Sequence, residues 1–251
     1  MKNTFKYIGI SVLFAFSFFY INKTNEFLIY NSKLLEIIKT QEENYNKVPV
    51  DAYVYGEYIV PGKKGKKVNI LESYYNLRPY DVFNSNFLIY EDIKPNISIK
   101  DNKEYYIEKG IDSNRVISLI IKDNKIIEEY ILNKEIVITK LIDITNNITN
   151  ANIQYINNDF NNFVDLSKKL DNKICVINAK IEKICRENDY YLVKPNTYIN
   201  NFNLLEIKQN ISSGQIIYIE DDLSIDNFLI LYNEILFKGY KLVKLSEMIS
   251  E

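Results

Sequence analysis

From Arg115 to the end of the 251-residue chain, short apolar runs alternate with longer amphipathic ones. The strand-like runs are VISLII, EIVITKLI, KICVIN, YYLV and GQIIYIE, and helix-like stretches such as KIIEEYILNK separate them. Strands that alternate with helices imply crossover connections, which place the strands parallel in one sheet. The pattern therefore predicts an α/β domain over residues 113–251, with a sheet that is either doubly wound or closed into a barrel.

The best-marked helix of this domain is predicted over Ser224 to Lys238. Its apolar residues share one face at helical spacing, namely Ile225, Phe228, Leu229, Tyr232, Ile235 and Leu236. Ser224 is a residue type favoured as an N-cap, and Gly239 suits the left-handed position after a helix end. We expect this helix to pack against the sheet.

An apolar run at residues 7–21 follows Lys2 and Lys6. About twenty apolar residues span a bilayer, so the run is short for a transmembrane helix and long for a signal-peptide core. No small-residue cleavage site follows it, which favours an uncleaved transmembrane anchor over residues 1–23; a cleaved signal peptide is the alternative. The lysines indicate a cytoplasmic N-terminus, so we expect a single-pass cell-membrane protein whose C-terminal domain is extracytoplasmic.

Two segments connect the anchor to the α/β domain. Residues 24–46 carry apolar residues at helical spacing before a polar tail, QEENYNK, which predicts a helical stalk. Residues 47–112 begin with alternating β-branched and aromatic residues and continue with turns and a short helix, which predicts a small α+β module. Four lysines in PGKKGKK, at 61–67, could contact an anionic polymer or lipid headgroups, or could simply be solvated.

Composition narrows the chemistry that the chain can perform. It has no histidine, which excludes Ser-His-Asp and Cys-His nucleophilic sites, histidine-ligated zinc and imidazole proton shuttles. A net charge of −2 argues against a nucleic-acid partner. Cys175 and Cys185 are the only cysteines; they could form a disulfide in an exported protein or remain two buried thiols.

Several segments resemble a known family when they are taken in order. RVISLIIKD and EIVITKLID resemble the first strands of the polysaccharide deacetylase (NodB homology, carbohydrate esterase family 4) domain, and SGQIIYIE and GYKLVKLSEMI resemble its end. YGEYIVPGKKGKKVNILESYYNL resembles the module that precedes such domains in some anchored Gram-positive members. The resemblance implies a distorted (β/α) barrel, carbohydrate metabolism of the cell envelope, and an envelope polysaccharide or peptidoglycan as partner.

The chemical residues of that family are missing from the matching positions. The family deacetylates its substrate with a metal held by one aspartate and two histidines, an aspartate base and a histidine acid. The base falls on Lys122, the metal aspartate survives as Asp123, the paired histidines fall within 151–159, and the closing histidine is Glu220. The resemblance therefore implies a pseudoenzyme that has lost the family metal, zinc or similar, and has no other cofactor.

Three functional alternatives follow. The first is a catalytically inactive protein that binds glycan or a partner protein, with Tyr155, Tyr190 and Tyr218 as candidate residues for stacking on sugar rings. The second is a hydrolase of envelope polysaccharide that uses carboxylates near Asp123 and Glu220, which requires both to face one cleft. The third is an anchored structural scaffold without a ligand, which a filled barrel mouth would favour.

Overall fold

The computed structural model describes residues 12–13, 15–20, 23–24, 30, 32–111, 115–143, 150–171, 173–178 and 180–251. The chain divides into two compact units, one formed by Met1–Val48 and Gly65–Ile93 and the other by Pro49–Lys64 and Lys94–Glu251. The residues that we expected to form one module over 47–112 are thus divided between the two units.

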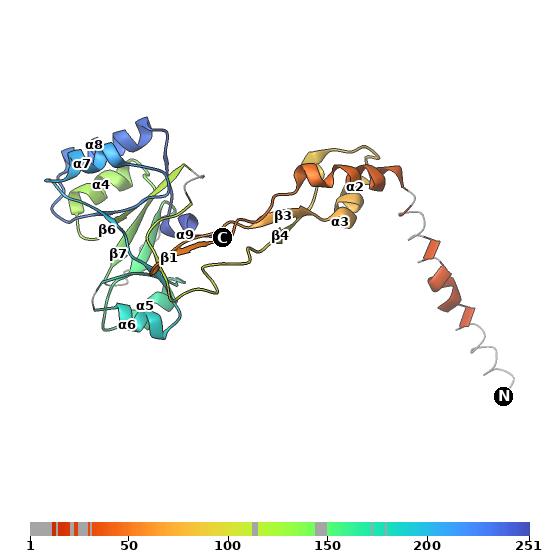
Figure 1. Ribbon diagram of the computed structural model, residues 1–251, viewed down its shortest axis with the longest axis horizontal. Coiled ribbons are helices and arrows are strands. Elements are labelled where there is room, and N and C mark those ends of the chain that lie inside the picture. Colours follow the sequence, from red (N-terminus) through yellow and green to blue (C-terminus); the bar gives the residue numbers. More distant parts are fainter. Residues whose placement is uncertain are drawn as a thin grey trace. The chain divides into compact units, whose positions relative to one another are not determined.

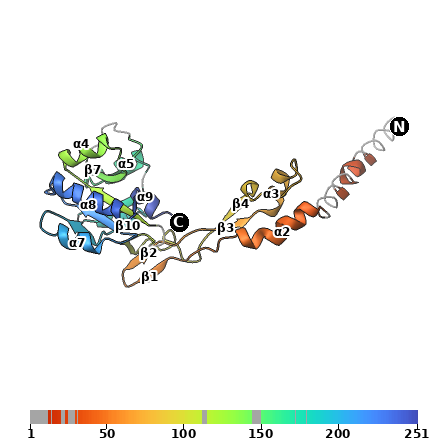
Figure 2. The ribbon, with the colours of Figure 1, turned by 90° about the horizontal axis from the view of Figure 1, so that it is seen from above.

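The smaller unit combines two helices with an antiparallel ribbon, seen beside one another in Figure 2. Its elements are α2 (Lys33–Tyr45), β3 (Gly65–Val68), α3 (Ile70–Leu77), the 3-10 turn η1 (Ser85–Phe87) and β4 (Tyr90–Ile93). Asn69 caps α3 by accepting a hydrogen bond from the Glu72 N–H at 3.0 Å. The apolar face of α2, with Leu35 and Ile38, packs against α3 rather than facing solvent.

No helix among the described residues is long and apolar enough to cross a membrane. The anchor that we predicted at residues 7–21 lies largely outside the described residues, so it stays a prediction.

The larger unit contains two sheets. The six-stranded sheet is parallel, with the order β11-β12-β6-β7-β8 and β13 paired to β6. Its strands are β6 (Val116–Ile121), β7 (Ile138–Ile142), β8 (Ile153–Asn157), β11 (Thr197–Ile199), β12 (Ile216–Ile219) and β13 (Lys241–Leu242). The five-stranded sheet has the order β1-β2-β5-β10-β9 and is parallel except for the β1–β2 hairpin. Its strands are β1 (Tyr53–Tyr55), β2 (Tyr58–Val60), β5 (Tyr106–Ile107), β9 (Ile174–Val176) and β10 (Tyr191–Val193).

Helices cover the outer faces of both sheets (Figure 1). They are α4 (Lys125–Asn133), α5 (Phe163–Lys169), α6 (Glu182–Glu187), α7 (Leu204–Asn210) and α8 (Ile225–Phe237). The short helix α9 (Leu245–Met248) instead packs into the core between the sheets. On β6, Leu119 and Ile121 face the cluster beneath α4, α7 and α8, whereas Ile120 faces the core between the sheets. Because both faces of β6 are buried, its sequence is a continuous apolar run. The predicted terminal helix is confirmed, since the Ser224 hydroxyl caps α8.

The two sheets do not close into the barrel that we expected. Among the described strands, β5 occupies the edge of β10 that β11 would need, through the pairs Leu192 with Tyr106 and Val193 with Ile107. Pro195 separates β10 from β11 and has no N–H to donate to a ladder, so the chain passes from one sheet to the other at this point. The result is an α/β fold with two facing sheets and a shared core.

Candidate functional site

The carboxyl edge of the six-stranded sheet brings together Lys122, Asp123 and Glu220, the residues that the resemblance matches to the family's catalytic positions. β6 and β12 are parallel neighbours, and Ile121 lies opposite Ile219 at their last residues. Lys122 and Glu220 therefore follow adjacent strand ends. Parallel strands present the residues after their carboxyl ends at one edge of a sheet, which is where α/β proteins bind ligands.

Lys122 supplies a positive charge at the centre of this edge. Its Nζ lies 3.4 Å from Asp143 Oδ2 and 3.8 Å from Asp123 Oδ2. The Lys122 side chain is 28% exposed and that of Asp123 is 71% exposed. Asp123, the residue that the resemblance matches to the metal aspartate, is thus a solvated carboxylate beside an ammonium group.

The loop after β6 is tied to the loop after β12. The Asp123 N–H donates to Asp221 Oδ1 at 3.3 Å, and the Asn124 side chain donates to the carbonyls of Asp221 and Leu223 at 3.2 and 2.9 Å. Asn124 also caps α4 by accepting from the Ile127 N–H. The acidic residues after β12 therefore help to fix the start of α4 as well as lining the edge.

These residues do not fit the family metal. A catalytic zinc site requires about three protein ligands with lone pairs, and no group of three such side chains gathers among the described residues. Lys122 also places an ammonium within ion-pair distance of Asp123, the only matching ligand. No step of a metal-assisted hydrolysis can be assigned to this arrangement.

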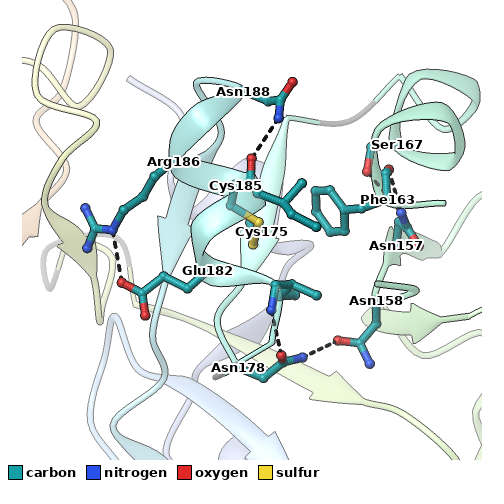
Figure 3. The surroundings of a disulfide bond; sticks show 12 residues. Asn157, Asn158, Phe163, Ser167, Cys175, Asn178, Glu182, Cys185, Arg186 and Asn188 are labelled. Carbon is teal, nitrogen blue, oxygen red and sulfur yellow. Dashed lines mark hydrogen bonds and ion pairs between the residues drawn. A yellow bond between two sulfur atoms is a disulfide. The ribbon is translucent and has the colours of Figure 1, made fainter. Parts of the chain in front are cut away.

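A cavity of about 600 Å³ lies at the same edge, over the ends of β6 to β9. Its lining is Lys122, Asp143, Asn158, Asp159, Phe160, Asn178, Lys180 and Ile181. Asn158 donates to Asp143 Oδ1 at 3.3 Å. Asn178 donates to Asn158 Oδ1 at 3.0 Å, as Figure 3 shows. Amide and carboxylate groups thus line the strand ends at this edge.

The sequence analysis did not identify Phe160, Asn158 or Asn178. Phe160 is 50% exposed and is the aromatic ring that lines this cavity. The available signal was the recurrence of Asn and Asp directly after consecutive strand-like runs, because those positions share one edge in a parallel sheet.

Of the three candidate tyrosines, Tyr218 lies closest to the relic carboxylates. It is on β12, and its ring centroid is 5.4 Å from that of Tyr198. Burial, followed by the negative charges of Asp221, Glu220 and Asp123, raises the pKa of Tyr218 to about 12. Its phenol therefore stays protonated and can donate a hydrogen bond at this edge.

The other two tyrosines lie elsewhere. Tyr190 is 5% exposed and its ring packs 5.2 Å from that of Phe163, so it cannot stack on a sugar. Tyr155, on β8, packs against the helix-covered face and borders a second cavity, at the amino end of the strand. Burial and the charge of Glu128 raise the pKa of Tyr155.

Cys175 and Cys185 form a disulfide, which decides between the two alternatives that the sequence left open. The bridge joins β9 to α6 and is fully buried, next to Phe163 (Figure 3). It therefore fixes the helix that begins just after Asn178, one of the cavity residues.

Solved structures of similar fold are known. A crystal structure of BA3943, described as a CE4 family pseudoenzyme from Bacillus anthracis, superposes with a TM-score of 0.56 at 15% identity, covering 87% of this chain and 95% of that one. The chain has the CE4 fold. A BA3943 mutant gives a TM-score of 0.56 at 15% identity and covers 87% of this chain and 98% of its own, and a mutant described as having restored enzymatic activity gives 0.55 with the same identity and coverage.

The CE4 fold therefore confirms the sequence resemblance at the level of architecture. No protein-family model matches the chain, and no curated protein matches it. Strands β6, β7, β9, β10 and β12 lie where the sequence predicted them, whereas β8 was not predicted and the described strands do not close into a barrel.

Proposed function

We propose that this protein is a degenerate, deacetylase-like protein of the cell envelope that binds glycan at the carboxyl edge of its sheet without deacetylating it. The observation that carries the proposal is the ion pair of Lys122 with Asp123, because the resemblance matches Lys122 to the family base. A general base must accept a proton from water, which a lysine ammonium cannot do. The solved CE4 pseudoenzyme of similar fold supports this reading.

The cavity at this edge supports binding rather than a purely structural role. Its volume of about 600 Å³ is of the size that holds a sugar unit or two. Phe160 offers a face for a sugar ring, and Asn158, Asn178 and Asp143 offer hydrogen-bond partners for hydroxyl and acetamido groups. Side chains that filled this end of the sheet and left no cavity would have favoured the structural scaffold without a ligand.

In this proposal the protein is anchored by residues 7–21 and faces outward. The apolar run after Lys2 and Lys6 supports the anchor. The buried disulfide agrees with an oxidising compartment. Peptidoglycan or another envelope polysaccharide is then the available partner.

The test uses the full chain in detergent and an N-acetylated chito-oligosaccharide. We expect calorimetric titration to detect binding and no acetate to be released when zinc or cobalt is added. Phe160→Ala should weaken binding at least fivefold, whereas Phe202→Ala, at a ring that is 93% exposed and outside the cavity, should leave it unchanged. Acetate release that Asp123→Asn abolishes would overturn the non-catalytic role.

The carboxylate hydrolase is the second candidate, because Asp123 and Glu220 do follow neighbouring strand ends. It predicts cleavage of the oligosaccharide chain itself, without loss of acetate. Chromatography of the same reaction separates the two: shorter oligosaccharides that disappear in Glu220→Gln would favour hydrolysis.

A further inference from the structure

We propose that the larger unit has a second ligand site, which binds a phosphate-bearing polymer at the amino-terminal edge of β8, β9 and β10. This edge is opposite to the one that holds Lys122, because the residues there precede the strands instead of following them. The inference does not depend on the glycan-binding proposal, since the two sites share no lining residue.

The site is a cavity of about 960 Å³. Ala151 precedes β8, Lys173 precedes β9, and Tyr191 begins β10. The loop before β5 and the C-terminal segment around α9 complete the wall. Its inner surface includes buried isoleucines, Ile99, Ile153, Ile174 and Ile249. The volume is at the upper end of ordinary ligand pockets, so it suits several units of a chain.

The charge of the cavity is unlike that of the whole chain. Six lysines line it, namely Lys64, Lys94, Lys100, Lys169, Lys173 and Lys244, against three carboxylates, Asp101, Asp171 and Glu251. The net charge of the chain is −2, so this concentration of positive charge is local. A concave surface lined by one sign of charge focuses the field and raises the local concentration of counter-ions.

Two of the three carboxylates are held by the protein's own donors. Glu251 Oε1 accepts from the Gly62 N–H at 2.8 Å and the Ile99 N–H at 3.0 Å, and Asp101 Oδ2 accepts from the Ser98 hydroxyl at 2.9 Å. These bonds hold both carboxylates against the wall.

Five of the lysine side chains have no carboxylate partner in the part of the chain that the structure describes. Among the residues that the structure describes, no ion pair or side-chain hydrogen bond reaches the ammonium groups of Lys94, Lys100, Lys169, Lys173 and Lys244. They come from separate segments, so the fold, and not a single basic stretch, gathers them. A bound polyanion would relieve their mutual repulsion.

The residue type points to phosphate. The cationic groups on this wall are lysines, and no arginine is among the described residues that line it. Lysine is a common phosphate-binding residue, and its ammonium acts as a hydrated point charge that pairs with single phosphate oxygens without a fixed planar geometry. Lysines distributed around a rim suit a flexible chain with repeated phosphates, and the buried isoleucines suit the carbon units between them.

The experiment titrates the full chain, in detergent, into a fluorescently labelled linear inorganic polyphosphate and follows anisotropy at several salt concentrations. We expect binding that weakens steadily as salt rises, because counter-ions are released. Lys100→Gln with Lys173→Gln should weaken binding at least tenfold and reduce the salt dependence. Lys125→Gln with Lys134→Gln, an equal charge change at exposed lysines outside the cavity, should change it less than twofold.

All four of these lysines are exposed, so the variants should keep the unfolding midpoint of the parent chain. Equal weakening by both pairs, or no binding by the parent chain, would overturn the site. Tighter binding of a single-stranded oligonucleotide than of polyphosphate with the same number of charges would also overturn it. Phe160→Ala should leave polyphosphate binding intact because Phe160 lines only the other cavity. Failure of the glycan proposal would therefore leave this result unchanged.

Discussion

The ammonium of Lys122 lies 3.4 Å from the carboxylate of Asp143 and so connects the ends of two neighbouring strands, β6 and β7. Lys122→Met keeps the aliphatic stem and removes the charge, which leaves Asp143 and Asp123 facing each other without a cation. Because the pair is partly exposed, we expect the free energy of unfolding in urea to fall by about 0.5–1 kcal/mol. The loss should shrink in high salt. Lys125→Met is the control; an equal loss there would show that the pair contributes nothing.

The Cys175–Cys185 disulfide should stabilise the fold measurably. It closes a loop with a sequence separation of 10, for which the chain-entropy estimate is about 3 kcal/mol. We expect Cys175→Ala with Cys185→Ala to lower the free energy of unfolding by about that amount in urea titrations. A reducing agent should move the parent chain in the same direction and leave the double variant unaffected. Unchanged stability of the parent chain under reduction would contradict this.

The raised pKa of Tyr218 should make the protein less stable at alkaline pH. Its pKa is raised in the folded state to about 12, mainly by burial and then by the nearby carboxylates, whereas an unfolded tyrosine titrates near pH 10. Between these values the unfolded chain has released a proton that the folded chain retains, so stability falls as pH rises. Tyr218→Phe should make the fall between about pH 10 and 12 less steep. An identical slope in both chains would contradict the assignment.

Gly62 is a position where even one methyl group cannot be accommodated. A Cβ there would lie 2.4 Å from the Val50 carbonyl oxygen and 2.8 Å from the Ala52 nitrogen, both backbone atoms. We expect Gly62→Ala to lower the free energy of unfolding by about 1–3 kcal/mol. Gly56, at the β1–β2 turn, has open space around it and a φ of +56°. Gly56→Asn should therefore be nearly neutral, since asparagine tolerates this conformation; equal losses at both sites would contradict the steric argument.

Strands β6, β7 and β12 of the six-stranded sheet were predictable because they are largely buried on both faces. Runs such as VISLII are then continuous in apolar residues, and residues after them meet at one edge, which is why Lys122, Asp123 and Glu220 could be placed together. The open barrel could not be predicted. It depends on the pairing of β5 with β10, a strand far along the chain, and a two-residue strand does not reveal its partner in the sequence.

The candidate site was predicted only in part for a related reason. Phe160 and Asn178 lie in loops, where no periodicity in the sequence indicates the direction of a side chain. The positions of these loops depend on β8, on β9 and on the disulfide, which hold their ends. The prediction that Tyr190 stacks on a sugar ring was wrong because Tyr190, just before β10, is buried against Phe163. Residue type alone could not separate it from Tyr218.

The pairing of β2 with β5, and of β5 with β10, determines where this chain can be cut. The larger unit is assembled from Pro49–Lys64 and Lys94–Glu251, with Gly65–Ile93 lying between them in the sequence but belonging to the other unit. A fragment that starts at residue 113 lacks β2 and β5, so one edge of β10 would be unpaired. The core residues that pack against Ile59 and Ile107 would also be exposed. Both changes favour aggregation of the fragment. A protease that nicks the loops within 65–93 would instead yield two pieces that stay associated and elute together.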